Sequence, residues 1–493
     1  MEKNDVYTNE ETLDPEDWDS MRTLGHQMMD DVIDYISTVR KRPVWNHMPE
    51  SVKKKISQSI PLEPESTDSI YTEFLENIMP YPSGNIHPRF WGWVIGTGTP
   101  MGMLSELLSA AMNSNSGGLD HHSANHVEKQ VIEWFKEIMR FPPSGSGLLT
   151  SGGSASNLIG LTAARNTMAS YDIRKEGIQP EKCRMTLYAS KEIHSSNTKA
   201  AELLGLGSDT LRTIPVNDAF QIDLEALKTA ITRDRSNGFT PFCIIGAAGT
   251  TNTGAIDDLN ALADICEKEN LWFHVDGAFG AWAVIAPEVK YLVKGIERAD
   301  SLAFDLHKWM YMPYEVGCIL VRKEENHRSS FSLTPDYLVH GTGGQGMTGG
   351  DLPWFSDYGF QLSRGFKALK VWMSLKEHGI KKYGRLIQQN INQIKYLEQL
   401  IKSEPVLELT VPASLNIVCF RYIGSDPENT KLDDLNKKIE IELQEKGIAV
   451  LSVTLIKNQT VLRAANTNHR TKREDFDILI KEIIKIGNTE NKI

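Results

Sequence analysis

A lysine stands in unusual surroundings near residue 308. The segment "DSLAFDLHKWMYMPYEVG", residues 300–317, places Lys308 at the end of a short apolar run, after Asp305 and His307 and before several aromatic residues. Long cationic side chains are rarely buried unless they are paired or take part in chemistry. An apolar pocket favours the neutral amine of a lysine, which can form a Schiff base with a carbonyl compound. A surface lysine whose stem snorkels over apolar residues is the commoner situation for any single lysine.

A glycine-rich turn offers a second candidate site. The segment "LLTSGGSASNLIGLTAARN", residues 148–166, reads as an apolar strand, a Gly-Gly turn and a helix. The start of a helix presents free N–H groups, glycines let an anion approach them closely, and Ser154 and Ser156 add hydroxyl groups. A phosphate cup and an ordinary tight turn with a helix cap both fit this pattern. The segment lacks the G-x-x-x-x-G-K-[ST] of a nucleotide P-loop and the G-x-S-x-G of a hydrolase elbow.

Two further polar residues follow predicted strands. His194 lies in "ASKEIHSSNTKAA", at the expected start of a helix, where a packed or capping histidine is the commoner reading. Asp276 ends the apolar run of "LWFHVDGAFGAWA". A buried carboxylate must be paired, either by capping a helix or by holding a cationic ring nitrogen. Each feature alone is weak, but a phosphate cup, a histidine, an acid and a lysine are together what a pyridoxal phosphate (PLP) enzyme requires.

Alternating strands and helices position these residues. Short β-like runs alternate with helical segments over 106–385, which predicts a mostly parallel sheet covered by helices on both faces, with ligands beyond the carboxyl ends of the strands. The predicted strands are "SGLLTS", "MTLYAS", "TLRTIPV", "PFCIIGAAG", "LWFHVDG", "ADSLAF" and "GCILVR", and the predicted helices include 155–169, 191–204, 223–233 and 257–269.

The chain divides into three predicted parts. Residues 1–105 read as a helical arm whose apolar faces need a partner surface, 106–385 as a large α/β domain, and 386–493 as a small α+β domain. The helical spacing of "WDSMRTLGHQMMDDVIDYISTVR" supports the arm. We find no internal repeats.

Composition excludes several classes of protein. With 493 residues, 24% of them charged and a net charge of -11, the chain is an ordinary globular protein without the basic surface that nucleic-acid binding needs. The five cysteines are scattered and form no C-x-x-C pair, and no apolar run is long enough for a membrane helix. The acidic N-terminus is unlike a signal peptide. We therefore expect a cytoplasmic protein that binds neither membranes nor nucleic acids.

The chain resembles the group II PLP-dependent amino acid decarboxylases, the superfamily of aromatic-L-amino-acid and glutamate decarboxylases. The resemblance runs from about residue 17 to the C-terminus, and its motifs fall at family spacings: "HPRFWGWV", "TSGGSAS", "HSS", "GTTNTGAIDD", "HVDGAFG" and "DLHKW". It implies the PLP-dependent transferase fold of type I, pyridoxal 5′-phosphate as cofactor, and decarboxylation of an L-amino acid to an amine and carbon dioxide.

Residue roles follow from the resemblance alone. It implies that Lys308 binds the cofactor covalently, that Asp276 pairs with the ring nitrogen, and that His194 stacks on the ring opposite Ala278. Of the other cofactor contacts, Ala155, Ser156 and His307 hold the phosphate and Thr251 lies near the ring hydroxyl. Many relatives have asparagine where this chain has Asp305, so the role of this carboxylate beside a phosphate is left open.

The reaction and the substrate depend on other segments. The glycine-rich stretch "SSFSLTPDYLVHGTGGQGMTGGDLPWFSDYG" predicts an active-site lid. Tyr337 stands where relatives carry the tyrosine that reprotonates Cα, which favours an amine over an aldehyde product. The implied substrate pocket contains Phe90, Trp91 and Trp93 from the arm, with Ser114, Ser116 and Ser363.

The resemblance implies an aromatic L-amino acid, because these positions line the side-chain pocket of aromatic decarboxylases, and Ser363 matches a site where plant relatives pair serine with phenolic substrates. A polar wall at Ser114–Ser116 also suits an acidic or other polar amino acid. An aldehyde synthase or another fold-type I PLP enzyme, and a non-catalytic protein that keeps the fold, stay open as alternatives. We expect a homodimer with its active site at the subunit interface, where the pocket wall crosses between subunits. We expect no metal, although "HHSANH" contains His121, His122 and His126.

Overall fold

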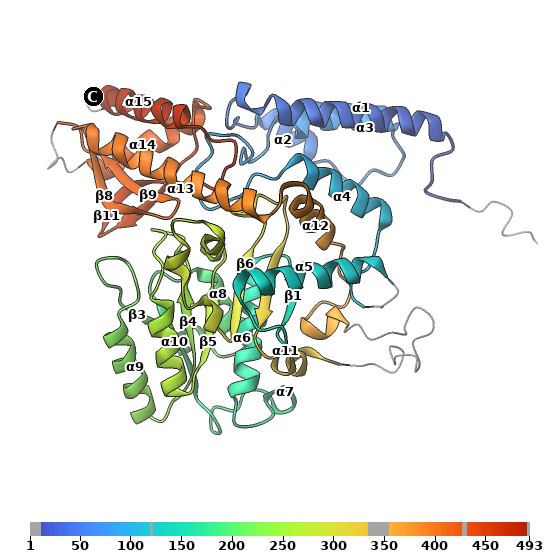
Figure 1. The fold of residues 1–493 in the computed structure, drawn as a ribbon. Coiled ribbons are helices and arrows are strands. Elements are labelled where there is room, and N and C mark those ends of the chain that lie inside the picture. The colour runs from blue at the N-terminus through green and yellow to red at the C-terminus, as the bar shows by residue number, and fades with distance from the viewer. Residues whose placement is uncertain (1–10, 119–121, 334–353, 426–430, 491–493) are drawn as a thin grey trace, which may run out of the picture.

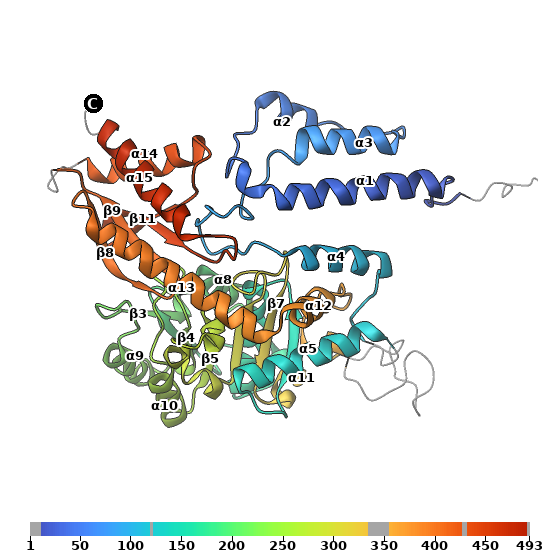
Figure 2. The ribbon, with the colours of Figure 1, turned by 45° about the horizontal axis from the view of Figure 1, so that its top comes forward.

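A computed structural model describes residues 11–118, 122–333, 354–425 and 431–490. The structure has two β-sheets with helices around them, and a group of N-terminal helices that lies to one side (Figures 1 and 2). None of the helices in the described part of the chain is long and apolar enough to cross a membrane.

Seven strands form the central sheet, in the order β1-β7-β6-β5-β4-β2-β3 (Figure 1). The strands from β6 to β3 are parallel to their neighbours, whereas β7 runs antiparallel to both β1 and β6. Burial on both faces explains why most of these strands are continuous apolar runs. The strands are β1 (Ser146–Thr150), β2 (Met185–Ser190), β3 (Leu211–Ile214), β4 (Thr240–Ala247), β5 (Trp272–Asp276), β6 (Ser301–Asp305) and β7 (Gly317–Val321). The predicted mostly parallel sheet and all seven predicted strands are confirmed.

Helices surround this sheet. Two of them begin a few residues later than predicted, because a capping residue precedes the first turn. The helix predicted over 191–204 begins only at residue 195 because His194 is its N-cap, and the one predicted over 257–269 begins after its N-cap, Asp258. The helices are α5 (Ser123–Met139), α6 (Gly153–Met168), α7 (Ile173–Glu176), α8 (Ser195–Leu203), α9 (Leu224–Ser236), α10 (Leu259–Glu269), α11 (Glu324–Phe331) and α12 (Ala368–His378).

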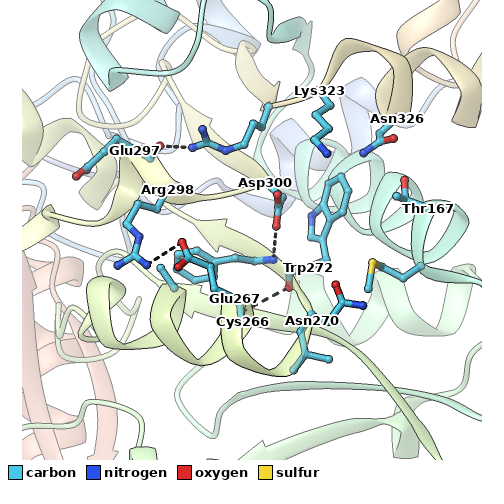
Figure 3. Close-up of a pocket in the computed structure, with 15 residues that line it drawn as sticks. Thr167, Cys266, Glu267, Asn270, Trp272, Glu297, Arg298, Asp300, Lys323 and Asn326 are labelled. Carbon is cyan, nitrogen blue, oxygen red and sulfur yellow. Dashed lines mark hydrogen bonds and ion pairs between the residues drawn. The ribbon is translucent and has the colours of Figure 1, made fainter.

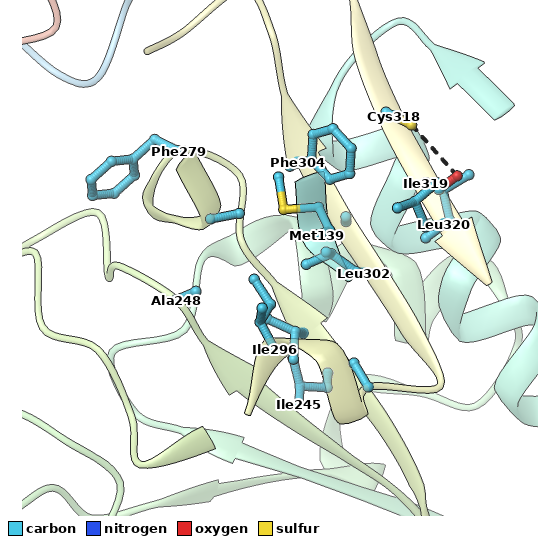
Figure 4. Close-up of a cluster of buried hydrophobic side chains, with 14 of the residues drawn as sticks. Met139, Ile245, Ala248, Phe279, Ile296, Leu302, Phe304, Cys318, Ile319 and Leu320 are labelled. Carbon is cyan, nitrogen blue, oxygen red and sulfur yellow. Dashed lines mark hydrogen bonds between the residues drawn. The ribbon is translucent and has the colours of Figure 1, made fainter. Parts of the chain in front are cut away.

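The core of the large sheet is closely packed and aromatic near β6. Side chains of β4, β6 and β7 lie in one cluster with Met139 of α5 (Figure 4). Phe304 of β6 packs edge to face against Phe135 and Trp282, with ring centroids 5.4 and 5.2 Å away. Such aromatic pairs contribute about 1 kcal/mol each beyond the burial of their area. These contacts hold β6, the strand that ends in Asp305, in the core.

A second, antiparallel sheet lies in the C-terminal region, with strand order β10-β11-β9-β8. The helices of this region pack against the sheet (Figure 1). Its elements are α13 (Ile380–Ser403), β8 (Leu407–Ser414), β9 (Ile417–Tyr422), α14 (Leu432–Glu445), β10 (Ser452–Ile456), β11 (Gln459–Ala465) and α15 (Arg473–Glu490).

The N-terminal helices lie outside both sheets (Figure 2). They are α1 (Trp18–Ser37), α2 (Glu50–Ile56), α3 (Thr67–Glu73) and α4 (Pro100–Met112). The predicted boundaries near residues 105 and 385 both fall inside helices, α4 and α13, so continuous helices connect the parts of the chain at these points. The division into three domains stays a prediction.

Candidate active site

The carboxyl ends of the strands bring the predicted polar residues together. Asp276 is the last residue of β5 and Asp305 the last of β6, and these strands are parallel neighbours. β1 ends at Thr150, immediately before the glycine turn. Thr150 pairs with Gly317 of β7, and Gly317 also pairs with Asp305 of β6. The turn and the lysine segment therefore meet at one edge of the sheet, as expected for an α/β site.

A cavity of about 330 Å³ lies at this edge. It contains six of the residues that the sequence predicted for the cofactor site. These six are Ala155, His194, Ala278, Asp305, His307 and Lys308. The remaining lining residues are Ser151, Gly152, Gly153, Ser154, Asn157, Ser196, Tyr314 and Glu315. Asp276 lies behind this lining and is bonded to Asn157.

The glycine turn fits closely under the lysine segment. Gly152 has a φ of +155°, and a Cβ at this position would lie 2.9 Å from Cε1 of His307. A Cβ on Gly153 would lie 3.1 Å from Oδ2 of Asp305. No described side chain caps α6 at Gly152, so the N–H groups of its first turn are open toward the cavity. This helix start provides the donors and the positive dipole that a phosphate group requires.

Two predicted cofactor contacts do not reach the cavity. The Ser156 hydroxyl is buried and lies 2.7 Å from Oγ1 of Thr150, and the Ser156 N–H donates to the carbonyl of Gly152 at 2.9 Å. Thr251 accepts a hydrogen bond from the Arg463 guanidinium through its carbonyl oxygen, and it is absent from the described lining. Of the two serines that the sequence offered as hydroxyl donors, Ser154 is exposed and lines the cavity, whereas Ser156 does not.

Three donors hold the Asp276 carboxylate. Its Oδ2 accepts hydrogen bonds from the side-chain amides of Asn157 at 3.0 Å and Asn197 at 2.7 Å, and its Oδ1 accepts from the backbone N–H of Ala278 at 3.2 Å. The carboxylate is buried and fixed in orientation. A buried negative charge of this kind can pair with a cationic ring nitrogen in the cavity.

A buried relay supports Asn157 from behind. Trp272 donates to the hydroxyl of Ser301 at 2.8 Å, and this hydroxyl lies 2.8 Å from Nδ1 of His274. Nε2 of His274 lies 3.0 Å from the side-chain oxygen of Asn157. A neutral His274 with its proton on Nε2 completes the relay and leaves the Asn157 amide nitrogen to face Asp276. The sequence prediction missed Asn157, Asn197 and His274, although His274 shares the face of β5 with Asp276 by its two-residue spacing.

His194 both caps a helix and lines the cavity. The Ser196 N–H donates to its Nδ1 at 3.2 Å, which makes the histidine the N-cap of α8. Burial lowers the pKa of His194, an effect that the nearby Asp276 partly opposes. At neutral pH the ring is therefore uncharged and suited to stacking. The capping role and the predicted ring contact are compatible, because they use different parts of the imidazole.

Asp305 faces the lysine. Its Oδ2 lies 2.9 Å from Nζ of Lys308 and 3.7 Å from Nε2 of His307. Its Oδ1 is buried and makes no hydrogen bond within the described residues. The sequence left the role of this carboxylate open, and the structure places it as the partner of the Lys308 ammonium group. Tyr314, which the sequence prediction also missed, packs against His307 at the cavity, with ring centroids 4.4 Å apart and the ring planes tilted by 34°.

The predicted substrate-pocket residues lie outside the cavity lining. Trp91 is fully buried in the C-terminal core, where its ring stacks on Phe476 at 4.6 Å, so it is not available to a substrate. Phe90 is also buried, whereas Trp93 is 59% exposed. The three serines differ in exposure: Ser114 is half-buried, Ser116 buried and Ser363 exposed. The local reason for the difference between the tryptophans is that Trp91 pairs with Val450 and turns inward, while Trp93 adopts a φ of +50° and turns outward.

The structure describes only part of the predicted lid and of the histidine cluster. Tyr337 and most of the predicted lid lie outside the described residues, and so does His121 of "HHSANH". Among the residues that the structure does describe, no group of three or more histidine, cysteine, aspartate or glutamate side chains is arranged to hold a metal ion.

Another cavity, of about 440 Å³, lies at the opposite edge of the sheet (Figure 3). It is bounded by the start of β5 at Trp272, by Asp300 before β6 and by Arg322 after β7. The Asp300 carboxylate accepts from the backbone of Phe273 at 2.9 Å. Arg322 donates to backbone carbonyls. These groups join the ends of strands, so their bonds stabilise the sheet, and the cavity contains none of the predicted catalytic residues.

Buried histidines should make the fold sensitive to acid. Burial lowers the pKa of His274 to about 4, of His327 to about 3 and of His469 to about 4. Below the ordinary value of 6.5 the unfolded chain binds protons that the folded chain excludes, so stability falls as the pH drops from 6.5 toward 4. We expect the free energy of unfolding to fall by roughly 1.4 kcal/mol per pH unit for each such histidine. Denaturant titrations across this range test the slope, and a flat profile would contradict it.

Comparisons with known proteins identify related sequences and a shared fold. The family model described as "Pyridoxal-dependent decarboxylase conserved domain" matches residues 49–423. The chain is 34% identical over 461 residues to an aromatic-L-amino-acid decarboxylase of Bacillus atrophaeus, covering 93% of each chain. It is 27% identical to a phenylacetaldehyde synthase of Arabidopsis thaliana, covering 92% of this chain and 93% of that protein. The crystal structure of Oryza sativa TDC with PLP and tryptamine superposes with a TM-score of 0.89 at 24% identity, covering 97% of this chain and all of the other, and shows the same fold.

Proposed function

Because the chain belongs to the pyridoxal-dependent decarboxylase family, we propose that it converts an aromatic L-amino acid, by preference a phenolic one, into the amine and carbon dioxide. Pyridoxal 5′-phosphate is the cofactor of this family, and the chain is a lyase. One observation carries the proposal: the Lys308 amine, the exposed start of α6 and the His194 ring line one cavity, and the Asp276 carboxylate lies directly behind it.

The residues of this cavity fit the cofactor. When bound, pyridoxal 5′-phosphate supplies a conjugated ring that accepts the electron pair left on Cα as carbon dioxide departs. The N–H groups at the start of α6 would hold its phosphate, with His307 beside them. Asp276 would hold a proton on the ring nitrogen, and the negative charge of its carboxylate would stabilise the protonated ring as electron density moves toward it. Lys308 would bind the cofactor through its amine, with Asp305 orienting that amine beforehand.

Of the remaining proposed cofactor contacts, three line the cavity and two do not. His194 would pack on one face of the ring and Ala278 on the other, with Ala155 at the phosphate. The side chains of Ser156 and Thr251 lie outside the described cavity lining, so these two residues would shape the site through the backbone next to them.

The choice of an aromatic substrate rests on the relatives and on the exposed Trp93. A relative with 34% identity is an aromatic-L-amino-acid decarboxylase. Trp93 packs on Phe90 but remains largely exposed, so it offers an aromatic surface. Ser114 and Ser363 supply hydroxyl groups suited to a phenolic ring. A polar or acidic amino acid is the second candidate, because the same serines would also suit its side chain.

A substrate panel tests this proposal. The PLP-loaded protein is incubated with L-tyrosine, L-tryptophan, L-phenylalanine, L-glutamate and L-histidine, and carbon dioxide, amine, aldehyde and peroxide are measured. We expect equal amounts of carbon dioxide and amine, with the highest kcat/KM for L-tyrosine. Turnover of L-glutamate alone would favour the second candidate, and no turnover of any amino acid would refute the proposal.

Tyr337 is proposed to return a proton to Cα. Replacing it with phenylalanine removes the acidic hydroxyl, so we expect carbon dioxide release to continue while aldehyde replaces amine as the main product. Product analysis by chromatography, with peroxide measured in parallel, checks this result. An unchanged amine yield in Tyr337→Phe would show that another group protonates Cα.

We further propose a homodimer that forms through the N-terminal helices. α1 and α4 expose large apolar side chains, among them Ile33, Leu107, Leu108 and Met112, and surfaces of this kind are normally covered. We expect light scattering to give twice the mass of the chain, and Leu107→Glu with Leu108→Glu to give an inactive monomer. An active monomer of the unmodified protein would contradict the proposal.

The buried, unpaired cysteines support a reducing cytoplasmic location.

A further inference from the structure

The loop that carries Lys308 contains a strained backbone position. Tyr311 has a φ of +54°, a left-handed conformation that is rare for a bulky residue and persists only where surrounding contacts enforce it. Its N–H donates to the carbonyl of Lys308 at 3.2 Å, and the next N–H, of Met312, returns to the carbonyl of Leu306 at 3.1 Å. The backbone therefore turns tightly around Lys308, and the geometry of this turn determines where the amine points.

A single side-chain oxygen holds the two rings that follow the lysine. Oδ1 of Asn390, on α13, accepts hydrogen bonds from the hydroxyl of Tyr311 at 2.7 Å and from the indole N–H of Trp309 at 3.1 Å. Both aromatic side chains are fully buried. Without this oxygen each buried donor would lose the acceptor that it has here, which costs free energy.

The Asn390 amide is itself fixed in orientation. Its Nδ2 donates to Oε1 of Gln393 at 3.2 Å and to the carbonyl of Asn468 at 3.0 Å. Asn390 is completely buried, and these bonds use both of its N–H groups. If the amide rotated by half a turn, its NH2 group would face the two donors of Trp309 and Tyr311, and no hydrogen bond could form between them. α13 and the segment after β11 thus hold the oxygen in one position.

The same elements also pack on the Tyr311 ring. The ring of Tyr383, on α13, stacks with it at 6.3 Å, and the ring of His469 meets it edge-on at 5.4 Å. Tyr311 is therefore held by its hydroxyl and by two ring contacts. All of these contacts come from residues beyond 380, far along the chain from the lysine.

We propose that Asn390 is a positioning residue for Lys308. It anchors Trp309 and Tyr311, maintains the left-handed turn, and so directs the lysine amine into the cavity beside Asp305. This inference rests on the proposed function, because it assumes that Lys308 is the residue that reacts with the cofactor.

A matched pair of variants tests the proposal. Asn390→Leu removes the anchor at similar volume. Asn436→Leu is the control, because Asn436 on α14 is equally buried and its side chain also makes a closed set of bonds, to the backbone of Tyr422 and Leu432. None of these bonds involves a residue of the lysine loop. Both variants should melt at a lower temperature than the unmodified protein, so any further difference between them reports on the loop.

Three readouts distinguish positioning from general stability. In the cofactor-free protein, hydrogen exchange at residues 306–312 should accelerate in Asn390→Leu but not in Asn436→Leu. The rate at which PLP reacts with the lysine, followed by visible absorbance, should fall about tenfold or more only in Asn390→Leu. Affinity for pyridoxamine 5′-phosphate, which has no aldehyde to react with the lysine, should be unchanged in both.

The outcomes separate this proposal from the proposed function. Equal slowing in both variants, or parallel loss of both cofactor forms in Asn390→Leu, would overturn the positioning role. If Asn390→Leu does not fold, Tyr311→Phe, which removes one hydroxyl, should still slow the reaction with PLP; an unchanged rate in that variant would overturn the proposal. If the unmodified protein does not react with PLP at all, the proposed function fails, while hydrogen exchange still shows whether Asn390 holds the loop.

Discussion

Lys308→Ala is expected to abolish turnover and to remove the visible absorbance of the bound cofactor. Alanine has no amine to bind the cofactor covalently, and the Asp305 carboxylate loses its partner at 2.9 Å. We expect kcat to fall by about 1000-fold or more, the loss typical of removing a covalent catalyst. Absorbance spectra of the protein after PLP loading and gel filtration, together with carbon dioxide release, measure both effects.

The control for this variant is a lysine outside the cavity lining. Lys136 on α5 is buried, and it donates to the carbonyls of Pro143 and Gly145. Lys136→Met should lower the melting temperature and keep the absorbance and the turnover. If Lys308→Ala retained the absorbance band while Lys136→Met lost it, the assignment of the reactive lysine would be wrong.

Asp276→Asn is expected to have the second-largest effect. Asparagine keeps the shape of the side chain but carries no charge to hold a proton on the ring nitrogen, so the ring accepts electrons less readily. We expect kcat to fall by about 100- to 1000-fold, in the range found when an electrostatic stabiliser is removed. Steady-state assays at saturating PLP check this, because they separate slower chemistry from weaker cofactor binding.

A second buried aspartate serves as the control. Asp234 on α9 accepts hydrogen bonds from Tyr188 and Arg212 and lies outside the cavity lining. Asp234→Asn should reduce stability and leave kcat unchanged. Near-normal kcat in Asp276→Asn would show that the charge at this position does not drive the reaction.

The fold was largely predictable because its strands are continuous apolar runs between turns. Strand existence follows from local composition, but strand direction does not. β1 and β7 are buried on both faces like their parallel neighbours, so nothing in their sequences indicates that they pair antiparallel. Helix starts were displaced by a few residues where a capping residue such as His194 precedes the first turn.

The site was predictable where its residues end strands, and less so where they act from a distance. Lys308, Asp276 and His194 follow apolar runs, a local pattern. Asn157 and Asn390 act through contacts between segments far apart in the chain, which no short stretch of sequence indicates. Trp91 and Trp93 are two residues apart, yet one is buried and the other exposed, because the backbone changes conformation between them.

The central claim is that Lys308 is the residue that binds the cofactor, and reductive trapping tests it most directly. The PLP-loaded protein is reduced with borohydride, which makes a lysine-linked cofactor permanent, and is then digested and analysed by mass spectrometry. The account predicts a single modified peptide with the added mass on Lys308, absent from Lys308→Ala. Modification of a different lysine in the unmodified protein, or of none, would contradict it.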